Sequence, residues 1–463
     1  MMDSADKIQS GQRIVVMGLG VSGRAAVKFL VSQGAHAFVS DSRGFNALPL
    51  ADQEYLQKNN ITFEGGGHSI SFLAQGDAIF ISPGIPTDLP LLQEMREKGV
   101  VILGELALAA PYLSESVVAV TGTNGKTTVT ALIGELLASS GKKVFVGGNI
   151  GTPILDYLCS SEKADVLVLE LSSFQLESAG NFCPHIGVLL NITPDHLDRH
   201  GTMADYLAAK MKMFSHQKTD DKAILFAGDS GYEKVRESLN KQEIYCFGGW
   251  QSDCAAKGRS NEVWVDVQGK PEKFSLKGSR LNSHTGLLNS EAAILVASLL
   301  GCEKKDIEKG LQNFAPASHR LQHVRTRHGV EFYNDSKATN TGAVLSALES
   351  FTGNVILIAG GRDKGEDYTV LKEMVQKKVR DLLLIGEAAQ AIETALDGVC
   401  QTRRAETMET AVLMAADIAR EGDIVLLAPA CASFDMFDNY GQRGDVFMQA
   451  VMALPEVTTE RAA

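Results

Sequence analysis

Residues 117–128 read VVAVTGTNGKTT, an apolar run followed at once by a glycine-rich loop, and a helix-like segment follows at 129–137. This order suits phosphate binding, because glycines let backbone N–H groups point at phosphate oxygens and the helix N-terminus adds partial positive charge. Lys126 supplies an ammonium, and the Thr127 hydroxyl can ligate Mg²⁺. Val120 stands where the full P-loop spacing has its first glycine, so the loop is a shortened variant. The alternative is a glycine-rich turn with a solvated lysine.

Short apolar runs alternate with longer mixed segments along the rest of the chain, as in strands joined by crossover helices around a parallel sheet. They fall into three series, which begin at Ile14, Val117 and Val330. Between about 246 and 277, alternating Val, Trp and Phe indicate a few antiparallel strands appended to the second series. We therefore expect an α/β fold of three domains, 1–104, 105–316 and 317–463. The first and third are expected to be Rossmann-like and the central one P-loop-like.

Composition and charge narrow the class of protein. The chain has 463 residues, enough for several buried cores. Its net charge of −12 disfavours binding to nucleic acid or to an anionic membrane surface. The seven cysteines are scattered without a CxxC pair, so we expect reduced, mostly buried thiols and a cytoplasmic protein. No apolar stretch approaches the roughly 18 residues of a membrane span, and we expect neither membrane insertion nor a signal peptide.

A second glycine motif, GLGVSG at 18–23, directly follows the first apolar run. With Asp41 at the end of the next run, it matches the dinucleotide fingerprint, in which a diphosphate lies at a helix N-terminus and an acid near a ribose. A nucleotide sugar offers a diphosphate as readily as NAD does. The motif therefore predicts a diphosphate site whose ligand class stays open, and a tight turn without a ligand is the alternative.

Acidic and imidazole side chains follow two strands of the central series. Glu170 ends the apolar run 166–169, where a metal-holding acid belongs beside a P-loop strand, whereas a surface glutamate is the alternative. His196, in NITPDHLD at 191–198, is a candidate to bind metal or to orient a reacting group. A capping loop with Asp195 is the alternative there. Spacing alone would place Lys210 on a helix surface.

Three polar loops follow strands of the third series, at 334–340, 360–364 and 429–433. Because open α/β sheets bind ligands at the carboxyl ends of their strands, we expect these loops to form one face for an anionic substrate. The alternative is three unrelated loops. Cys431 is a candidate nucleophile, and packing is the alternative, since no histidine partner is identifiable and its neighbours are apolar.

Taken in order, the motifs GLGVSG, GTNGKTT, LELSSFQLE, NITPDHLD, HR, NDSKATN and PACASFDMFDNYGQRG resemble those of the Mur ligases of peptidoglycan synthesis. The resemblance runs from about Gly18 to Phe447, and residues 430–444 are most similar to the D-glutamate-adding branch of that family. It implies an N-terminal domain for the UDP-substrate, a central ATPase domain and a C-terminal domain for the amino acid. The family usually has His-Asn followed by a second Asn. Here Thr285 follows His284 in place of the first Asn, and Asn289 matches the second Asn.

The resemblance also implies roles for individual residues. Catalysis would involve Lys126, Glu170, His196 and a carbamylated Lys210, and the metal ligands would be Thr127, Glu170, His196 and Lys210. ATP would contact Gly122, Thr123, Asn124, Gly125, Lys126, Thr127, Thr128, Asn289, Arg320 and Asp335. The UDP-substrate would contact Val21, Ser22, Asp41, Ser42, Arg43, Ser82, Asn149 and Ser172. D-Glutamate would contact Lys337, Thr339, Lys364, Ser433 and Tyr440.

The implied reaction is ATP-dependent amide formation, in which D-glutamate joins UDP-N-acetylmuramoyl-L-alanine through an acyl phosphate. The implied cofactors are ATP, two Mg²⁺ ions and the carbamylated lysine, and we expect a monomer that acts on small-molecule substrates and binds no nucleic acid. Three alternatives stay open: another Mur ligase or a folylpolyglutamate synthase, an NAD-dependent oxidoreductase built on residues 18–23, and a non-enzymatic nucleotide switch. Hydride chemistry would leave the loop GTNGKTT without a role.

Overall fold

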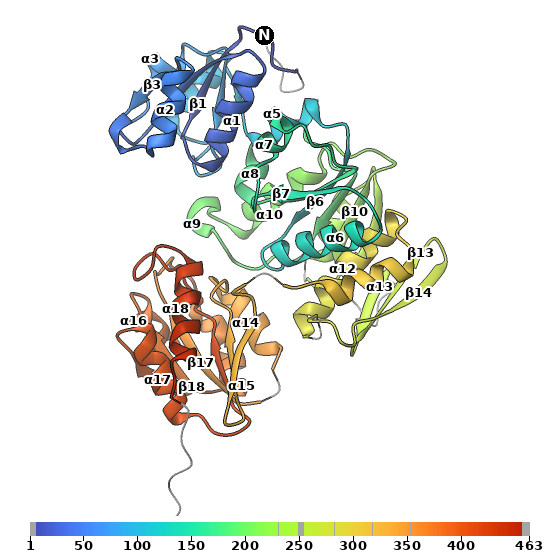
Figure 1. Ribbon diagram of the computed structural model, residues 1–463, viewed down its shortest axis with the longest axis vertical. Helices are drawn as coiled ribbons and strands as arrows, with labels where there is room; N and C mark the ends of the chain where they lie inside the picture. The colour runs from blue at the N-terminus through green and yellow to red at the C-terminus, as the bar shows by residue number, and fades with distance from the viewer. Residues whose placement is uncertain are drawn as a thin grey trace, which may run out of the picture. The chain divides into compact units, whose positions relative to one another are not determined.

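The computed structural model describes residues 6–229, 231–248, 254–281, 283–316, 318–351 and 353–455. These residues divide into two compact units. Figure 1 labels the helices and strands along the chain. The first unit runs to Ile192 and includes Arg199–Ser279 and Leu287–Phe314, and the second comprises Thr193–Asp198, Arg280–Gly286 and the chain from Ala315 onward. Three sheets of five, nine and six strands confirm the predicted α/β class. The residue boundaries of the three domains stay predictions.

The first sheet has the order β3-β2-β1-β4-β5, and each neighbouring pair is parallel. The strand order reverses at β1, so the loops after β1 and β4 flank the position where such sheets bind ligands. The motif GLGVSG occupies the first of these loops. The elements are β1 (Arg13–Met17), α1 (Val21–Ser32), β2 (His36–Asp41), α2 (Leu50–Lys58), β3 (Thr62–Gly65), α3 (Ile70–Leu73), β4 (Ala78–Ile81), α4 (Pro90–Glu97) and β5 (Val101–Leu103).

The second sheet has the order β14-β13-β12-β11-β10-β9-β6-β8-β7. Its strands pair in parallel from β7 to β12. The β12–β13 and β13–β14 pairs are antiparallel, which confirms the predicted appendage to the central series. Its strands are β6 (Ser116–Thr121), β7 (Val144–Gly148), β8 (Val166–Glu170), β9 (Ile186–Leu189), β10 (Lys222–Phe226), β11 (Glu243–Phe247), β12 (Ala256–Arg259), β13 (Glu262–Val267) and β14 (Lys270–Ser275). The helices of this region are α5 (Glu105–Ala109), α6 (Lys126–Ser139), α7 (Ile154–Cys159), α8 (Ser173–Glu177), α9 (Leu197–His200), α10 (Met203–Met211), α11 (Tyr232–Ser238), α12 (His284–Leu299) and α13 (Lys304–Asn313).

The third sheet has the order β15-β16-β20-β17-β18-β19, and only the β15–β16 pair among its described strands is antiparallel. The sequence analysis missed both edge strands, because QHVRTR and QTRR are polar, as exposed edges usually are. The strands are β15 (Gln322–Arg327), β16 (Val330–Asn334), β17 (Val355–Gly360), β18 (Val379–Ile385), β19 (Gln401–Arg404) and β20 (Ile424–Leu427). The helices are α14 (Thr341–Glu349), α15 (Lys372–Lys378), α16 (Ala389–Ala395), α17 (Met408–Ile418) and α18 (Tyr440–Met452).

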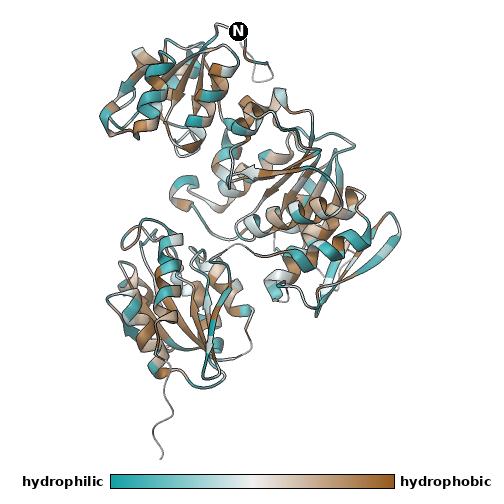
Figure 2. Cartoon of the chain, in the orientation of Figure 1, coloured by the Kyte–Doolittle hydropathy of each residue, from teal (hydrophilic) through white to brown (hydrophobic). Residues whose placement is uncertain are grey.

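Apolar side chains cover both faces of the central strands. In β17, Leu357 belongs to the core on one face, whereas Ile356 and Ile358 belong to the core on the other. A strand buried on both faces reads as a continuous apolar run, which is why the sequence predicted these strands well. Figure 2 shows the hydrophobic residues gathered along the strands. None of the described helices combines the length and apolarity needed to cross a bilayer.

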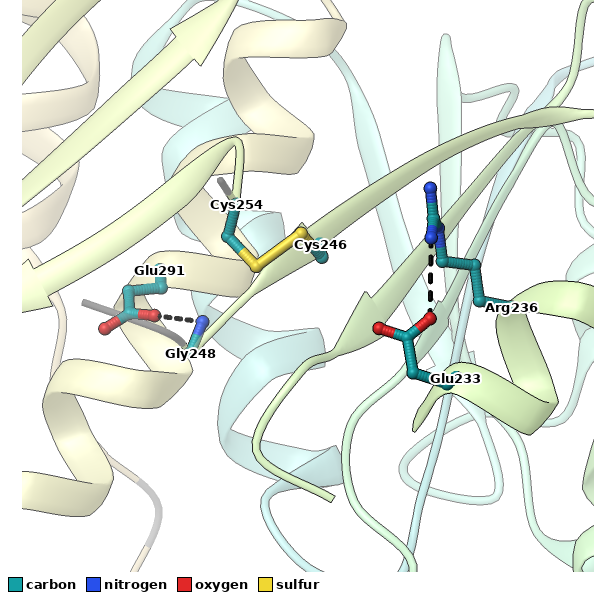
Figure 3. Close-up of a disulfide and its surroundings, with 6 residues drawn as sticks. All are labelled: Glu233, Arg236, Cys246, Gly248, Cys254 and Glu291. Atoms are coloured by element: carbon teal, nitrogen blue, oxygen red, sulfur yellow. Dashed lines mark hydrogen bonds and ion pairs between the residues drawn. A yellow bond between two sulfur atoms is a disulfide. The ribbon is translucent and has the colours of Figure 1, made fainter. Parts of the chain in front are cut away.

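Cysteine pairing differs from the sequence prediction. Cys246 in β11 and Cys254 just before β12 form a disulfide, with their Cα atoms 4.8 Å apart (Figure 3). Because β11 and β12 pair at Phe247 and Ala256, two cysteines without a CxxC spacing come within bridging distance. Of the other five, only Cys431 is buried. The expectation of reduced, mostly buried thiols was therefore wrong.

Candidate active site

The glycine-rich loop lies between β6, which ends at Thr121, and α6, which begins at Lys126. Gly122 and Gly125 adopt positive φ angles of 146° and 85°. A Cβ atom at Gly122 would come within 2.9 Å of Leu190, and one at Gly125 within 2.7 Å of the Asn289 side chain. The loop therefore needs glycine for space as well as for backbone angle, and Asn289 lies beside it.

Lys126 and Thr127 lie in the first turn of α6, where backbone N–H groups have no partner within the helix. The Lys126 ammonium donates hydrogen bonds to the carbonyl oxygens of Gly122 and Thr123, at 3.0 and 2.8 Å. It thus lies folded over the loop. An ammonium, a helix N-terminus and glycine N–H groups together favour a bound phosphate.

Glu170 ends β8, the strand beside β6, and only 2% of it is exposed. Its Oε2 accepts a hydrogen bond from the Thr127 hydroxyl at 2.7 Å, and its Oε1 accepts one from the Asn149 amide at 2.9 Å. Burial excludes the alternative of a glutamate that leaves the sheet at the surface. Asn149, predicted as a UDP-substrate contact, therefore lies at the Glu170 carboxylate.

Asn191, which the sequence analysis did not single out, holds the glycine loop in place. Its side chain accepts the Asn124 N–H at 2.8 Å and donates to the Asn124 carbonyl at 3.0 Å. Its own carbonyl accepts the Thr123 N–H at 2.7 Å. The available signal was a polar amide directly after the buried run 187–190, at the carboxyl end of a strand.

Lys210, near the end of α10, is buried, with 1% of it exposed. Its ammonium donates to the Gly122 carbonyl oxygen at 2.8 Å and lies 4.5 Å from the centre of the Tyr206 ring. Spacing alone, which placed this lysine on a helix surface, was therefore misleading. The structure brings Lys210 to the loop that carries Lys126.

His196 and Asp195 belong to the second unit, whereas Thr127 and Glu170 belong to the first. Asp195 accepts the His196 N–H at 3.0 Å and the Asn340 amide at 3.1 Å. Within the described residues, no group of three or more His, Cys, Asp or Glu side chains is arranged to hold a metal. A metal site that includes His196 therefore stays a prediction.

Asp41, at the end of β2, organises the first glycine motif. Its carboxylate accepts the Leu19 N–H at 2.6 Å and two hydrogen bonds from the Arg43 guanidinium, at 2.8 and 2.9 Å. Arg43 in turn donates to the Leu19 carbonyl at 3.0 Å. The guanidinium holds the pKa of Asp41 far below its usual range. Asp41 and Arg43 therefore act on the loop as a pair.

The remaining first-sheet candidates differ in exposure. The Ser82 hydroxyl donates to the Gly18 carbonyl at 2.7 Å, which fixes the start of the motif. Val21 and Ser42 are exposed and so accessible to a ligand. No Cβ fits at Gly23, because it would lie 2.0 Å from the Gly18 carbonyl oxygen.

Buried Glu105 links Ser22 with the region of Ser172. Its carboxylate accepts the Ser22 hydroxyl at 2.9 Å and the Ile154 N–H at 3.0 Å, and it is also hydrogen-bonded to Gln175. Gln175 in turn accepts the Ser172 N–H at 3.0 Å in the capping box of α8. Burial raises the pKa of Glu105. Two predicted substrate-binding serines are thus connected through one carboxyl group that sequence reasoning missed.

The three polar loops of the third sheet follow β16, β17 and β20, which lie side by side and run parallel. This arrangement confirms that they share one end of the sheet. Arg443 of α18, which the sequence analysis did not single out, is fully buried between two of them. Its guanidinium donates to the Ser336 hydroxyl and, at 2.9–3.1 Å, to the carbonyls of Ser336, Cys431 and Ala432. The one sequence signal for Arg443 was its place in GQRG, the end of the motif PACASFDMFDNYGQRG.

The predicted D-glutamate contacts lie on these loops and on α18. The Lys337 ammonium lies 3.8 Å from the centre of the Tyr440 ring. Thr339 and Lys364 are partly exposed, and Ser433 is 2% exposed. All five belong to the second unit, and their contact with D-glutamate stays a prediction.

Arg320 and Asp335, predicted to contact ATP, also belong to the second unit, whereas the glycine loop and Asn289 belong to the first. Asp335 accepts the Leu321 N–H at 3.2 Å. Burial raises the pKa of Asp335 to about 6, against the opposing effect of the Arg320 charge. The predicted ATP contacts are therefore divided between the two units.

Cys431 is a packing residue rather than a nucleophile. It is 1% exposed, and its sulfur lies 3.3 Å from the Tyr368 hydroxyl. Burial raises the pKa of its thiol to about 12, so the reactive thiolate is scarce at neutral pH.

Three models of one protein family match successive parts of the chain: a MurD-like N-terminal domain at residues 12–104, a Mur ligase middle domain at 120–293 and a Mur ligase glutamate ligase domain at 319–431. A curated protein of Desulfotalea psychrophila, named UDP-N-acetylmuramoylalanine–D-glutamate ligase, is 50% identical over 99% of both chains. This chain belongs to the Mur ligase family. Its predicted resemblance to that family is thereby confirmed.

Other members of the family extend the comparison. A protein of the same name from Koribacter versatilis is 41% identical and covers 96% of this chain and 98% of its own. Among solved structures, a pseudomurein peptide ligase type C of Methanothermus fervidus has a TM-score of 0.61 at 18% identity and covers 96% of this chain and 100% of its own. MurF ligase of Thermotoga maritima, solved in complex with ADP, has a TM-score of 0.58 at 19% identity, with coverage of 98% and 99%. At these identities the two structures support the Mur ligase fold alone.

Proposed function

We propose that this chain is an ATP-dependent ligase that forms an amide bond between UDP-N-acetylmuramoyl-L-alanine and D-glutamate. The observation that carries the proposal is the near full-length 50% identity with a relative of that name. The glycine loop, with Thr127 and Glu170 in contact at its end, supplies the matching chemistry. Peptidoglycan precursor synthesis is the corresponding process.

The reaction needs activation of a carboxylate, which is a poor electrophile because oxide is a poor leaving group. Transfer of the ATP γ-phosphoryl group to the carboxylate gives an acyl phosphate, whose phosphate leaves when the amine attacks through a tetrahedral intermediate. The approach of two anions requires neutralised charge and fixed alignment. The Lys126 ammonium and the N–H groups at the start of α6 can supply both, and Asn191 keeps the loop in the required shape.

The residues at the loop fit a magnesium ion, since a threonine hydroxyl and a carboxylate 2.7 Å apart offer the oxygen ligands that Mg²⁺ prefers. When bound, Mg²⁺ would neutralise phosphate charge during transfer. We propose that Thr127 and Glu170 are ligands of this ion. His196 and a carbamylated Lys210 are proposed as further ligands, so that the four side chains together serve two Mg²⁺ ions. In the described structure, the Lys210 amine donates to a carbonyl oxygen, so a carbamate would have to exchange this contact for others.

For the nucleotide substrate, we propose that the loop 18–23 receives the diphosphate at the N-terminus of α1. The Ser22 hydroxyl already donates a hydrogen bond to Glu105. We therefore assign the backbone N–H of Ser22, rather than its hydroxyl, to the diphosphate. Arg43 would add a positive charge beside the ligand, and its ion pair with Asp41 would partly neutralise that charge. Ser82, Asn149 and Ser172 are proposed as further contacts.

For D-glutamate, two carboxylates must be held at separate points while the amine stays available for attack. Lys364 and Thr339 are proposed to hold the α-carboxylate and Ser433 the side-chain carboxylate, with Lys337 and Tyr440 close by. The buried Arg443 supports the loops that carry these residues, because its hydrogen bonds join Ser336 to residues 431 and 432.

The alternatives are less well supported. An NAD-dependent oxidoreductase leaves the buried contacts around Lys126 and Glu170 without a role, and a nucleotide switch does not need an amino-acid pocket. We further propose that the protein acts in the cytoplasm as a monomer, since ATP and a UDP-linked sugar are cytoplasmic metabolites and the three domains supply the whole set of proposed contacts.

Phosphate release from ATP tests the proposal. The full chain is incubated with Mg²⁺, ATP and UDP-N-acetylmuramoyl-L-alanine, and D- and L-amino acids are added one at a time. We expect release with D-glutamate and a product heavier by one glutamyl residue. Release with a different amino acid would reassign the substrate, and none with any amino acid would contradict ligase activity.

A further inference from the structure

A cavity of about 230 Å³ lies within the first unit. It is bounded by the end of β9 and the residues after it, by α10, by the end of β10, and by α11. Met203 and Leu207 line it from α10, Phe226 from β10, and Tyr232 and Val235 from α11. None of the roles proposed above uses this cavity.

The size and lining of the cavity define what fits. Pockets for drug-sized ligands measure about 300–1,000 Å³, whereas an apolar cavity of roughly 150 Å³ in another protein accepts benzene. At about 230 Å³, this cavity therefore suits one aromatic ring or a short alkyl chain with a small polar group. The mainly apolar lining favours an apolar body, because water gains few hydrogen bonds there.

Asp229 gives the cavity its polarity, since it is the one charged side chain among the described lining residues. Its Oδ2 accepts the Ile192 N–H at 2.9 Å. Burial raises the pKa of Asp229 to about 6, so the group is mostly ionised at pH 7.5 yet poorly solvated. Arg236 of α11 pairs with Glu233 at 3.4 Å (Figure 3). Both side chains are exposed. A cationic group on a ligand would complement the Asp229 carboxylate.

We propose that this cavity is a binding site for a small primary amine with an aromatic or aliphatic body, its ammonium paired with Asp229. Asp229 is hydrogen-bonded to Ile192, which directly follows the loop-holding Asn191. The lining residues of α10 also belong to the helix that carries Lys210. Occupancy of the cavity should therefore change ATP affinity, and by linkage ATP should change amine affinity by the same factor. This coupling, unlike the amine site itself, rests on the proposed function.

Titration calorimetry on the full chain at pH 7.5, without nucleotide, tests the site directly. The probe is 2-phenylethylamine, and 2-phenylethanol is its uncharged counterpart. We expect saturable amine binding with a Kd of about 1 mM or tighter, as nine heavy atoms allow. Asp229→Asn, which keeps an oxygen for the Ile192 N–H, should weaken amine binding at least about tenfold and leave 2-phenylethanol unchanged.

A second experiment fills the cavity with a larger side chain and measures binding of both probes again. Leu207→Trp, or Ala204→Trp at the exposed rim if the first variant does not fold, should abolish binding of both probes. Leu413→Trp is the control, because Leu413 is 57% exposed in α17 and should leave binding unchanged. Absence of saturable binding, or binding that survives both filling variants, would overturn the amine site.

The coupling is tested by titrating ATP with and without saturating 2-phenylethylamine. A change of at least about threefold in ATP affinity, absent in Asp229→Asn, is expected. Unchanged ATP affinity would overturn the coupling. A chain that binds the amine but no ATP would contradict the proposed ligase function and leave the amine site established.

Discussion

The Lys210 ammonium donates a hydrogen bond to the carbonyl oxygen of Gly122, at 2.8 Å, and thereby touches the loop that carries Lys126. A buried cation there would repel Mg²⁺, whereas a carbamate formed from the unprotonated amine and CO₂ would attract it. We expect Lys210→Ala to lower kcat at least about 100-fold. A short carboxylic acid should partly restore activity by replacing the missing anion.

Lys212→Ala is the matched control, because Lys212 lies two residues further on and is exposed. Carbon-13 NMR after exchange with labelled CO₂ should show a carbamate signal in the wild-type protein and in Lys212→Ala but not in Lys210→Ala. Full activity in CO₂-free buffer, with no such signal, would refute the carbamate.

Lys126→Ala should abolish turnover and leave the affinity for the UDP-substrate within about twofold. The two ligands are assigned to glycine loops that follow β1 and β6, strands of different sheets. The measurement is calorimetric binding of the UDP-substrate beside phosphate release. Lys143→Ala, an exposed lysine after α6, should change neither quantity. Loss of UDP-substrate affinity in Lys126→Ala would contradict the assignment of two separate loops.

The parts of this site that sequence predicted well are local. A glycine loop between an apolar run and a helix needs only adjacent residues, so Lys126 and Thr127 could be placed from their own segment. Glu170 followed from one further rule, that polar groups at the carboxyl ends of neighbouring parallel strands lie together. The central strands were equally easy to predict, because a strand covered on both faces of the sheet is a continuous run of apolar residues.

The parts that sequence could not predict depend on contacts between distant segments. Asn191 acts through Asn124, 67 positions away, and Arg443 through Ser336, 107 positions away. The burial of Lys210 results from packing of α10 against the loop, which helical periodicity does not report. The Cys246–Cys254 disulfide depends likewise on the pairing of β11 with β12.

Arg43→Ala should raise the KM for the UDP-substrate about tenfold with little change in kcat, the sign of lost uniform binding. The Arg43 side chain is 41% exposed although it pairs with Asp41, so part of it is accessible to a ligand. Arg13→Ala, which removes an exposed arginine paired with Asp77 on the same sheet, is the control and should leave KM unchanged. An unchanged KM in Arg43→Ala would limit Arg43 to its structural pairing with Asp41.

Glu291 should make stability depend on pH. Burial raises its pKa from 4.5 to about 7, although the Gly248 and Gly258 N–H groups oppose the shift. The folded state therefore binds more protons than the unfolded state between about pH 4.5 and 7, so the unfolding free energy falls as pH rises through this window. A shift of this size corresponds to at most on the order of 3 kcal/mol.

Urea unfolding at several pH values, with the disulfide intact, measures this slope. Glu291→Gln should remove most of the decline, because glutamine does not titrate. Glu233→Gln is the control, since Glu233 has a side chain that is 68% exposed. Equal slopes in the wild-type protein and in Glu291→Gln would show that other groups cause the pH dependence.

Ser433→Ala should raise the KM for D-glutamate about ten- to a hundredfold and barely change that for ATP. Ser433 is 2% exposed, and its carbonyl accepts the N–H groups of Met436 and Phe437, so its position is fixed by the loop. A hydrogen bond from a buried hydroxyl to a carboxylate contributes roughly 1.5–3 kcal/mol, which corresponds to this range of KM. Ser350→Ala at the end of α14 is the matched control, because its hydroxyl bonds only the Ser346 carbonyl among the contacts described for it.

Lys364→Ala separates the two carboxylates of the substrate. If Lys364 holds the α-carboxylate, its loss should also raise the KM for D-glutamate. In the double variant with Ser433→Ala, the two losses of binding free energy should be nearly additive, because the two side chains would contact different ends of the ligand. Both KM values are measured in all three variants. A rise in the KM for ATP alone would mean that these loops complete the nucleotide site, together with Arg320 and Asp335, and that the amino acid binds elsewhere.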